Sequence, residues 1–184
     1  PATFDTSVSR EALISLFDTA IQLAKASRSA FLVVPALLSR GTLLDMMGEH
    51  SRAQSAFDNA YLLAPSDPAV ALSFGQYYLA NGNPDAAFPL FQKALSLNNS
   101  PDARFFSALC IVSRSKQSDS SEWLPLAIEA ASSEQCTHRV TALDLAIGEL
   151  LAQKRFIESE ALIQQAEGTG INAIVAKAAR YWIG

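Results

Sequence analysis

The sequence predicts an all-α protein: a right-handed α-solenoid of about four helical hairpins, with one further helix at each end. Two observations lead to this prediction. Apolar residues recur at helical spacing, and a pattern of small and aromatic residues repeats at an offset of 34 residues. The 184 residues therefore form one expected solenoid domain, residues 1–184, in which each hairpin buries its apolar face against its neighbours.

The first expected helix spans residues 9–27. Its apolar residues fall on one stripe, which is typical of an amphipathic helix packed on a neighbour. They are Leu13, Leu16, Phe17, Ala20, Leu23 and Ala24. At the start of an array such a helix covers the outer face of the first hairpin, which would otherwise be exposed. The alternative is that residues 9–27 occupy the concave side of the array.

Residues 34–67 and 68–101 form two clear repeats. The first helix of each ends at a glycine, Gly48 or Gly82. In the second repeat Asn83-Pro84-Asp85 then provides an N-cap, a first-turn proline and an acid for the next helix. The pairs that align at the offset of 34 are Leu38/Leu72, Ser39/Ser73, Gly41/Gly75, Leu44/Tyr78, Gly48/Gly82, Ala53/Ala87, Phe57/Phe91, Ala60/Ala94, Leu63/Leu97 and Ser66/Ser100.

The small and aromatic residues of these repeats predict close packing between helices. A glycine inside a helix costs about 1 kcal/mol relative to alanine, so Gly41 and Gly75 indicate close approach of a neighbouring helix. Alanines seven residues apart form a shallow seam, and Phe57 and Phe91 fill the space between them. The residues expected to pack the repeats are Gly41, Ala53, Phe57, Ala60, Gly75, Tyr78, Ala87, Phe91 and Ala94.

Two further repeats, residues 102–135 and 137–168, are degenerate. The third places Leu109-Cys110 where Phe74-Gly75 stands in the second, and the fourth places Ile147-Gly148 there. The polar segment 113–121 is either a connecting loop or a serine-rich stretch that accepts phosphate or contacts a partner. Residues 171–183 are either a capping helix or the first half of a fifth repeat. Pro89, about six residues into its helix, predicts a kink.

Composition and motifs argue against several classes of function. Net charge is −4 and the 14 Lys and Arg residues are scattered, so no basic surface for nucleic acid is expected. The apolar run 30–38 is far shorter than the roughly 20 residues that span a bilayer, so no membrane insertion is expected. There is no phosphate-binding glycine loop and no nucleophile elbow. We therefore expect no enzymatic activity and no cofactor.

The histidines and cysteines do not predict a metal centre. Asp45-x-x-x-Glu49-His50 and Cys136-Thr-His138 each offer fewer ligands than the four of a closed zinc site. Cys110 and Cys136 are expected to be buried free thiols. This expectation favours a cytoplasmic protein, with the periplasm as the alternative if an upstream signal has been removed.

The 34-residue recurrence of Gly41/Gly75, Ala53/Ala87 and Phe57/Phe91 resembles the tetratricopeptide repeat (TPR) family. In that family large, small and aromatic residues recur over a helix–turn–helix, and a peptide or helix of a partner protein binds the concave side. The resemblance therefore implies a groove-forming role for Leu38, Ser39, Thr42, Asp45, Met46, Leu72, Ser73, Gln76, Leu79, Phe106, Ser107, Cys110 or Ile111, and Arg114.

One subset of the family holds a C-terminal carboxylate with Lys, Asn and Arg at such positions. Here only Arg114 is basic, so a carboxylate clamp is not expected. The apolar and hydroxyl-bearing positions instead suit an extended apolar peptide or an amphipathic helix. The alternative for some of these side chains is that they pack against a flanking helix.

Residues 102–114, "DARFFSALCIVSR", are similar to the Arg-Phe-Phe stretch of the translocator chaperones of bacterial type III secretion. The glycine spacing is equally similar to that of TPR scaffolds for secretion and pilus assembly. These resemblances imply an adaptor, assembly factor or chaperone. The alternatives are the interaction domain of a larger regulator or enzyme, and a self-associating structural scaffold.

Overall fold

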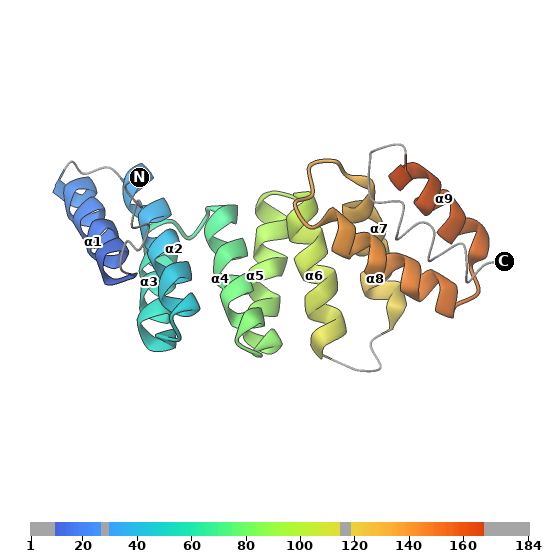
Figure 1. The fold of residues 1–184 in the computed structure, drawn as a ribbon, viewed down its shortest axis with the longest axis horizontal. Coiled ribbons are helices and arrows are strands. Elements are labelled where there is room, and N and C mark those ends of the chain that lie inside the picture. The colour runs from blue at the N-terminus through green and yellow to red at the C-terminus, as the bar shows by residue number, and fades with distance from the viewer. Residues whose placement is uncertain (1–9, 27–29, 115–118, 168–184) are drawn as a thin grey trace, which may run out of the picture.

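The computed structural model describes residues 10–26, 30–114 and 119–167. This part of the chain contains nine α helices and no strand (Figure 1). The helices are α1 (Arg10–Ala26), α2 (Ala30–Met46), α3 (His50–Leu63), α4 (Pro68–Ala80), α5 (Pro84–Leu97), α6 (Pro101–Arg114), α7 (Ser120–Ser132), α8 (Arg139–Ala152) and α9 (Phe156–Glu167). The segment 171–183, expected to cap the array or begin a fifth repeat, lies outside the described residues.

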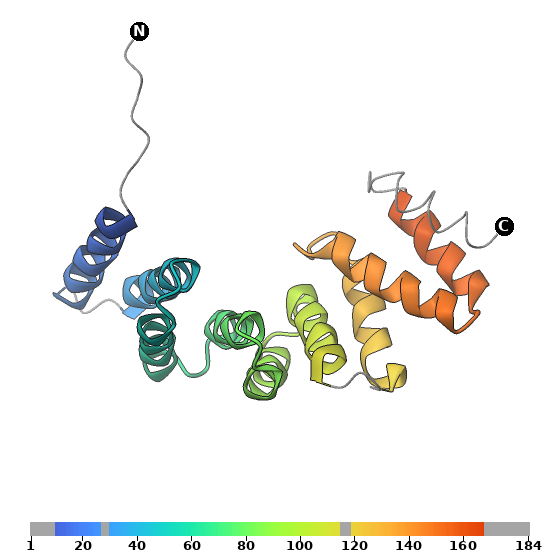
Figure 2. The ribbon, with the colours of Figure 1, turned by 60° about the horizontal axis from the view of Figure 1, so that its bottom comes forward.

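The helices form a chain of hairpins, because each helix packs against the next one in sequence. In Figure 2 the array is an arc: α2, α4 and α6 lie toward its inner side, and α3, α5 and α7 lie toward its outer side. Contacts between α2 and α4, and between α4 and α6, join neighbouring hairpins along the inner side. The predicted all-α, right-handed solenoid of helical hairpins is confirmed.

Helix α1 stands at the N-terminal end of the array. It packs against α2, where Ile21 and Ala24 join a buried cluster with Val33 and Val34. Asp18 of α1 also forms an ion pair with Arg40 of α2, with Nε of Arg40 and Oδ1 of Asp18 2.6 Å apart. Because Figures 1 and 2 show α1 beyond α2, it covers the end of the array and leaves the inner sides of α4 and α6 uncovered.

The helix boundaries follow the capping chemistry that the sequence indicates. Asp67 caps α4 by accepting a bond from the Ala69 N–H at 2.8 Å, and Asn83 caps α5 by accepting one from the Ala86 N–H at 3.1 Å. Gly48 and Gly82 have φ of +77° and +72°, a conformation that glycine adopts without penalty. Both glycines therefore end the helices as expected.

Two boundaries differ from the expected ones. Helix α2 begins at Ala30, four residues before the expected start of the first repeat, and continues through Pro35. Helix α6 runs to Arg114 and α7 begins at Ser120, so the connection between them is shorter than the expected polar loop 113–121. Asp119 begins α7 early because its carboxylate accepts a bond from the Ser121 N–H at 2.9 Å.

Pro89 lies inside α5, which nonetheless runs unbroken from Pro84 to Leu97. Pro35 and Pro125 occupy the same place in α2 and α7, the sixth residue of each helix. All three proline side chains are exposed. Each proline lies so near the start of its helix that its missing N–H removes a bond only to a first-turn carbonyl. The helices therefore continue past all three.

The glycines at the centre of the two clear repeats face phenylalanine rings. A Cβ placed on Gly41 would lie 2.9 Å from Cε2 of Phe57, and one placed on Gly75 would lie 2.6 Å from Cε1 of Phe91. Because these distances are too short for two carbons, only glycine lets each ring lie directly on the helix backbone. The aligned alanines Ala53, Ala60, Ala87 and Ala94 are all buried, as the seam requires. Tyr78 is partly buried and stacks on Phe74, with ring centroids 4.7 Å apart.

The fourth repeat departs from this pattern. Gly148 was expected to be its packed small residue, but it is exposed and no neighbouring atom lies within 4 Å of a Cβ placed on it. Ile147 is buried instead, in one cluster with Ile163, which follows it by the same 16 residues that separate Gly75 from Phe91. Two aliphatic side chains thus replace the glycine and the ring, and the expected register was wrong by one residue.

This placement predicts that Gly148→Ala stabilises the protein. The substitution removes the helix cost of glycine without meeting another atom, so the free energy of unfolding should rise by up to about 1 kcal/mol. Urea denaturation followed by circular dichroism measures the change. A destabilised Gly148→Ala chain would contradict the exposed position of this residue.

Candidate functional site: a groove between helices α4 and α6

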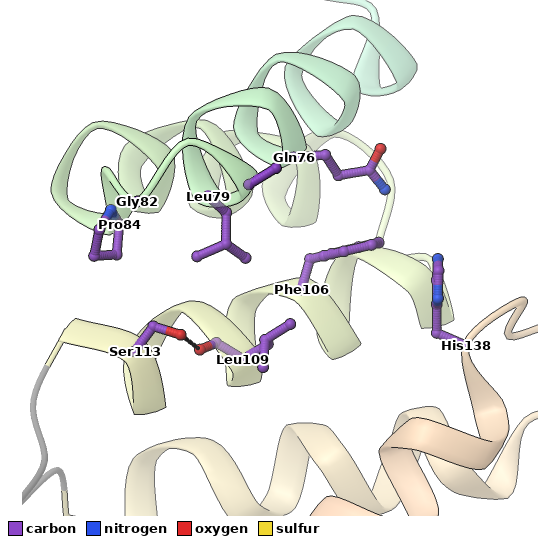
Figure 3. Close-up of a pocket in the computed structure, with 9 residues that line it drawn as sticks. Gln76, Leu79, Gly82, Pro84, Phe106, Leu109, Ser113 and His138 are labelled. Carbon is purple, nitrogen blue, oxygen red and sulfur yellow. Dashed lines mark hydrogen bonds between the residues drawn. The ribbon is translucent and has the colours of Figure 1, made fainter. Parts of the chain in front are cut away.

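The inner side of the array contains an open groove of about 740 Å³ between α4 and α6 (Figure 3). Its lining comes from α4, from the turn into α5, from α6 and from the turn before α8. The lining residues are Gln76, Leu79, Ala80, Gly82, Pro84, Phe106, Leu109, Ser113 and His138. The groove therefore joins residues of three successive hairpins.

Helical spacing explains why these side chains share the groove. On α4, Gln76 and Leu79 are three residues apart, and on α6, Phe106, Leu109 and Ser113 follow at steps of three and four. Residues at such spacing lie on one face of a helix. In Figure 3 the side chains of Leu79 and Phe106 point into the space between the two helices. The walls are therefore mainly apolar.

Aromatic rings close one end of the groove. Phe106 stacks on Phe91 with ring centroids 5.7 Å apart, and Phe105 meets the Phe106 ring edge to face with centroids 5.0 Å apart. The imidazole of His138 lies parallel to the Phe105 ring at 5.1 Å and meets the Phe106 ring at 4.8 Å with a 76° tilt. Since Phe91 is fully buried, this group of rings has a rigid base.

The groove has polar side chains but no charged one. Gln76, Ser113 and His138 supply its polar groups, and the Ser113 hydroxyl donates a bond to the Leu109 carbonyl at 2.8 Å. Arg114, at the end of α6, pairs instead with Asp85 at 2.9 Å and lies over the Phe88 ring. A ligand in this groove would therefore meet apolar surface and a few hydrogen-bonding side chains, none of which is Asp, Glu, Lys or Arg.

Only part of the expected partner-binding set lines the groove. Gln76, Leu79 and Phe106 do. Leu72 packs against two buried clusters, and Ser73 is half-buried outside the lining. Ser107 is fully buried, and its hydroxyl has no hydrogen-bond partner within the described residues. Neither Leu72 nor Ser107 presents its side chain to the groove, because each faces the seam between helices.

The expected positions on α2 lie outside this groove. Leu38 is partly buried against two clusters, while Ser39 is exposed. Thr42 donates a bond to the Leu38 carbonyl at 3.1 Å. Asp45 accepts bonds from His50 and from Asn81, each at 2.9 Å, and Met46 is 77% exposed. Asp45 thus links the turn after α2 to the C-terminal end of α4 through these hydrogen bonds.

Leu109 and His138 were not among the expected groove residues, and Ser113 was expected only as part of the polar segment 113–121. The step of three and four residues from Phe106 could have indicated Leu109 and Ser113, since it marks one helix face. Cys110, assigned to the small-residue position of the third repeat, is indeed buried and packs with Phe91. No local signal could have indicated His138, because the turn before α8 reaches Phe106 only through the packing of α6 against α7 and α7 against α8.

The two cysteines, which remain from the residues considered for chemistry, lie outside the groove. Among the described residues, no group of His, Cys, Asp and Glu is arranged to hold a metal ion, and no helix is long and apolar enough to cross a membrane. Cys110 and Cys136 are buried and free, as expected. The Cys110 thiol donates to the Pro84 carbonyl at 3.2 Å and the Cys136 thiol to Asp102 at 3.5 Å.

Burial raises the pKa of each thiol from 9.0 to about 11. A pKa raised by folding means that the buried thiols favour the native chain below pH 9, and that this contribution is lost as the pH rises toward 11. At pH 8 the native thiolate fraction should be about 100-fold lower than in the unfolded chain. A chromogenic disulfide reagent should therefore react with both cysteines at least about 100-fold more slowly without urea than with it, and equal rates would contradict their burial.

Comparisons with known proteins bear on the fold. No model of a protein family and no curated protein matches this sequence. Among solved structures, this chain is similar to the crystal structure of YrrB, described as a TPR protein with an unusual peptide-binding site, with a TM-score of 0.60 and 15% sequence identity. The likeness covers 96% of this chain and 94% of the YrrB chain. With its 34-residue recurrence and its array of helical hairpins, this chain has the fold of the tetratricopeptide repeat proteins.

Proposed function

We propose that this chain is a non-catalytic protein-interaction module that binds a peptide or an amphipathic helix of a partner protein between α4 and α6. The observation that carries the proposal is the apolar groove on the inner side of the array, built by Leu79, Phe106 and Leu109. Apolar side chains of a partner would leave water on entering this groove, which is the main favourable term in such binding.

Three further observations support the proposal. The groove of about 740 Å³ has room for a few side chains of a partner. Its base is rigid, because Phe91 is fully buried, so little ordering is required on binding. YrrB, which shares the fold, is described as having a peptide-binding site. The role would be that of an adaptor, an assembly factor or a chaperone.

The test is retention of a partner by the immobilised chain from a lysate of the cells that produce it, followed by mass spectrometry. The proposal expects at least one protein to be retained by the wild-type chain and lost when the groove is altered. A partner retained equally by a chain with an altered groove would contradict the location, and measurable turnover of that partner would contradict the non-catalytic role.

A further inference from the structure

We infer that the end of the groove formed by Gln76, Phe106 and His138, here called the aromatic subsite, binds an aromatic side chain of an extended, uncharged peptide segment. This inference rests on the proposed function and specifies its ligand. The three residues come from α4, from α6 and from the turn before α8, and Figure 3 shows them around one end of the groove. His138 is thereby a specificity-determining residue.

The charge of the groove selects an uncharged segment. None of the lining residues is an Asp, Glu, Lys or Arg. The basic residues on α6 are engaged elsewhere, since Arg104 pairs with Glu129 at 2.9 Å and Arg114 pairs with Asp85 at 2.9 Å. A carboxylate or ammonium group entering the groove would lose water without gaining a partner of opposite charge. The bound segment should therefore be neutral along the groove.

The polar groups of the subsite favour an extended chain over a helix. The Gln76 amide and the His138 imidazole make no hydrogen bond with another residue in the described part of the chain. An extended peptide has unpaired N–H and C=O groups to offer them, whereas the backbone of a helix is satisfied internally. The distance from Phe106 to Ser113, seven residues along α6, is about 10 Å, which matches three residues of extended chain.

The rings of the subsite favour an aromatic side chain over an aliphatic one. His138 is held parallel to Phe105 and tilted by 76° against Phe106, so the subsite has a fixed set of ring faces and edges. Aromatic side chains gain from offset or edge-to-face contact with such rings beyond the area that they bury. This gain corresponds to about threefold to tenfold in affinity over an aliphatic side chain of similar size.

The experiment uses three blocked peptides, acetylated and amidated, titrated into the full chain and followed by NMR. The first is Ser-Leu-Phe-Leu-Ser, the second is Ser-Leu-Leu-Leu-Ser, and the third is a stapled helix that presents Phe and Leu four residues apart. We expect the first to bind about threefold to tenfold more tightly than the second and to shift the signals of the His138 ring and the Gln76 side-chain amide. His138→Leu, which keeps a similar bulk and loses the ring, should abolish the preference, and it should weaken the second peptide only by the loss of its hydrogen bond to the imidazole.

Several results would overturn the inference. They are equal affinity for the first two peptides, tighter binding of the stapled helix, signal shifts away from the subsite, failure of all three peptides to bind, or a preference that survives in His138→Leu. The proposed function fails separately. If the second peptide or the helix binds the groove without aromatic preference, only the subsite is lost. If a partner from the lysate is retained despite an altered groove, the proposed function itself is lost.

Discussion

Replacing Phe91 by alanine should lower the free energy of unfolding by about 3–5 kcal/mol, the range for removing a large aromatic side chain from a core. Phe91 is fully buried, lies directly on the backbone of α4 at Gly75, and stacks on Phe106. Its removal leaves a cavity between α4, α5 and α6 that two rigid helices cannot close. Urea denaturation of the wild type and the variant, followed by circular dichroism, measures this loss.

A double-mutant cycle separates this packing from a general loss of apolar surface. In the wild type Gly75→Ala should be destabilising by about 1–2 kcal/mol, because the added methyl group would lie 2.6 Å from a ring that cannot move aside. In the Phe91→Ala chain the same change should be stabilising. The three nearest atoms to the new methyl group all belong to that ring, and alanine favours the helix by about 1 kcal/mol. The same sign of effect in both backgrounds would contradict the contact between Gly75 and Phe91.

Replacing Leu79 by aspartate should weaken partner binding by about 100-fold or more. The change places a carboxylate on the apolar wall of the groove, opposite Phe106, where none of the lining residues can pair with it. Leu79 is only half-buried, so the array should remain folded. Retention of the partner from lysate, and its dissociation constant once it is identified, provide the measurement.

Two further variants keep this prediction falsifiable. Gln92→Asp is the matched control, because Gln92 is exposed on α5 and does not line the groove; this variant should bind like the wild type. Ala80→Arg narrows the groove from an exposed position without removing a packed side chain, and it should also weaken binding. If Leu79→Asp and Ala80→Arg both fold and both bind with full affinity, the partner does not use this groove.

The repeat packing could be predicted from the sequence because its signals are local and occur twice. Gly41 and Gly75, and Phe57 and Phe91, recur at one spacing, so each pair supports the interpretation of the other. The local pattern is a weaker guide where this pair of residues is replaced. In the fourth repeat Ile147 and Ile163 take the places of the packed glycine and phenylalanine. Gly148 was expected to be the packed residue because it is a glycine, but it lies one residue too far around the helix.

The candidate site could be predicted only in part. Leu72 and Leu79 are both apolar residues of α4, and their spacing alone does not tell which of them faces a neighbouring helix and which faces the groove. Similarly, Ser107 is adjacent to Phe106 but is fully buried. The rotation of each helix against two neighbours decides these positions, since a change of one residue turns a side chain by about 100°.

By itself the sequence determined the class of fold, the turns and the core of the two clear repeats. These features depend on backbone conformation at glycine, on capping by Asp67 and Asn83, and on contacts between residues 16 apart within one hairpin. Only the tertiary structure decided the groove. Its walls come from α4 and α6, and its aromatic end includes His138, which lies 32 residues beyond Phe106 and reaches it only when the hairpins stack. A local pattern records contacts within a hairpin, whereas a surface shared by three hairpins depends on how their packing accumulates along the array.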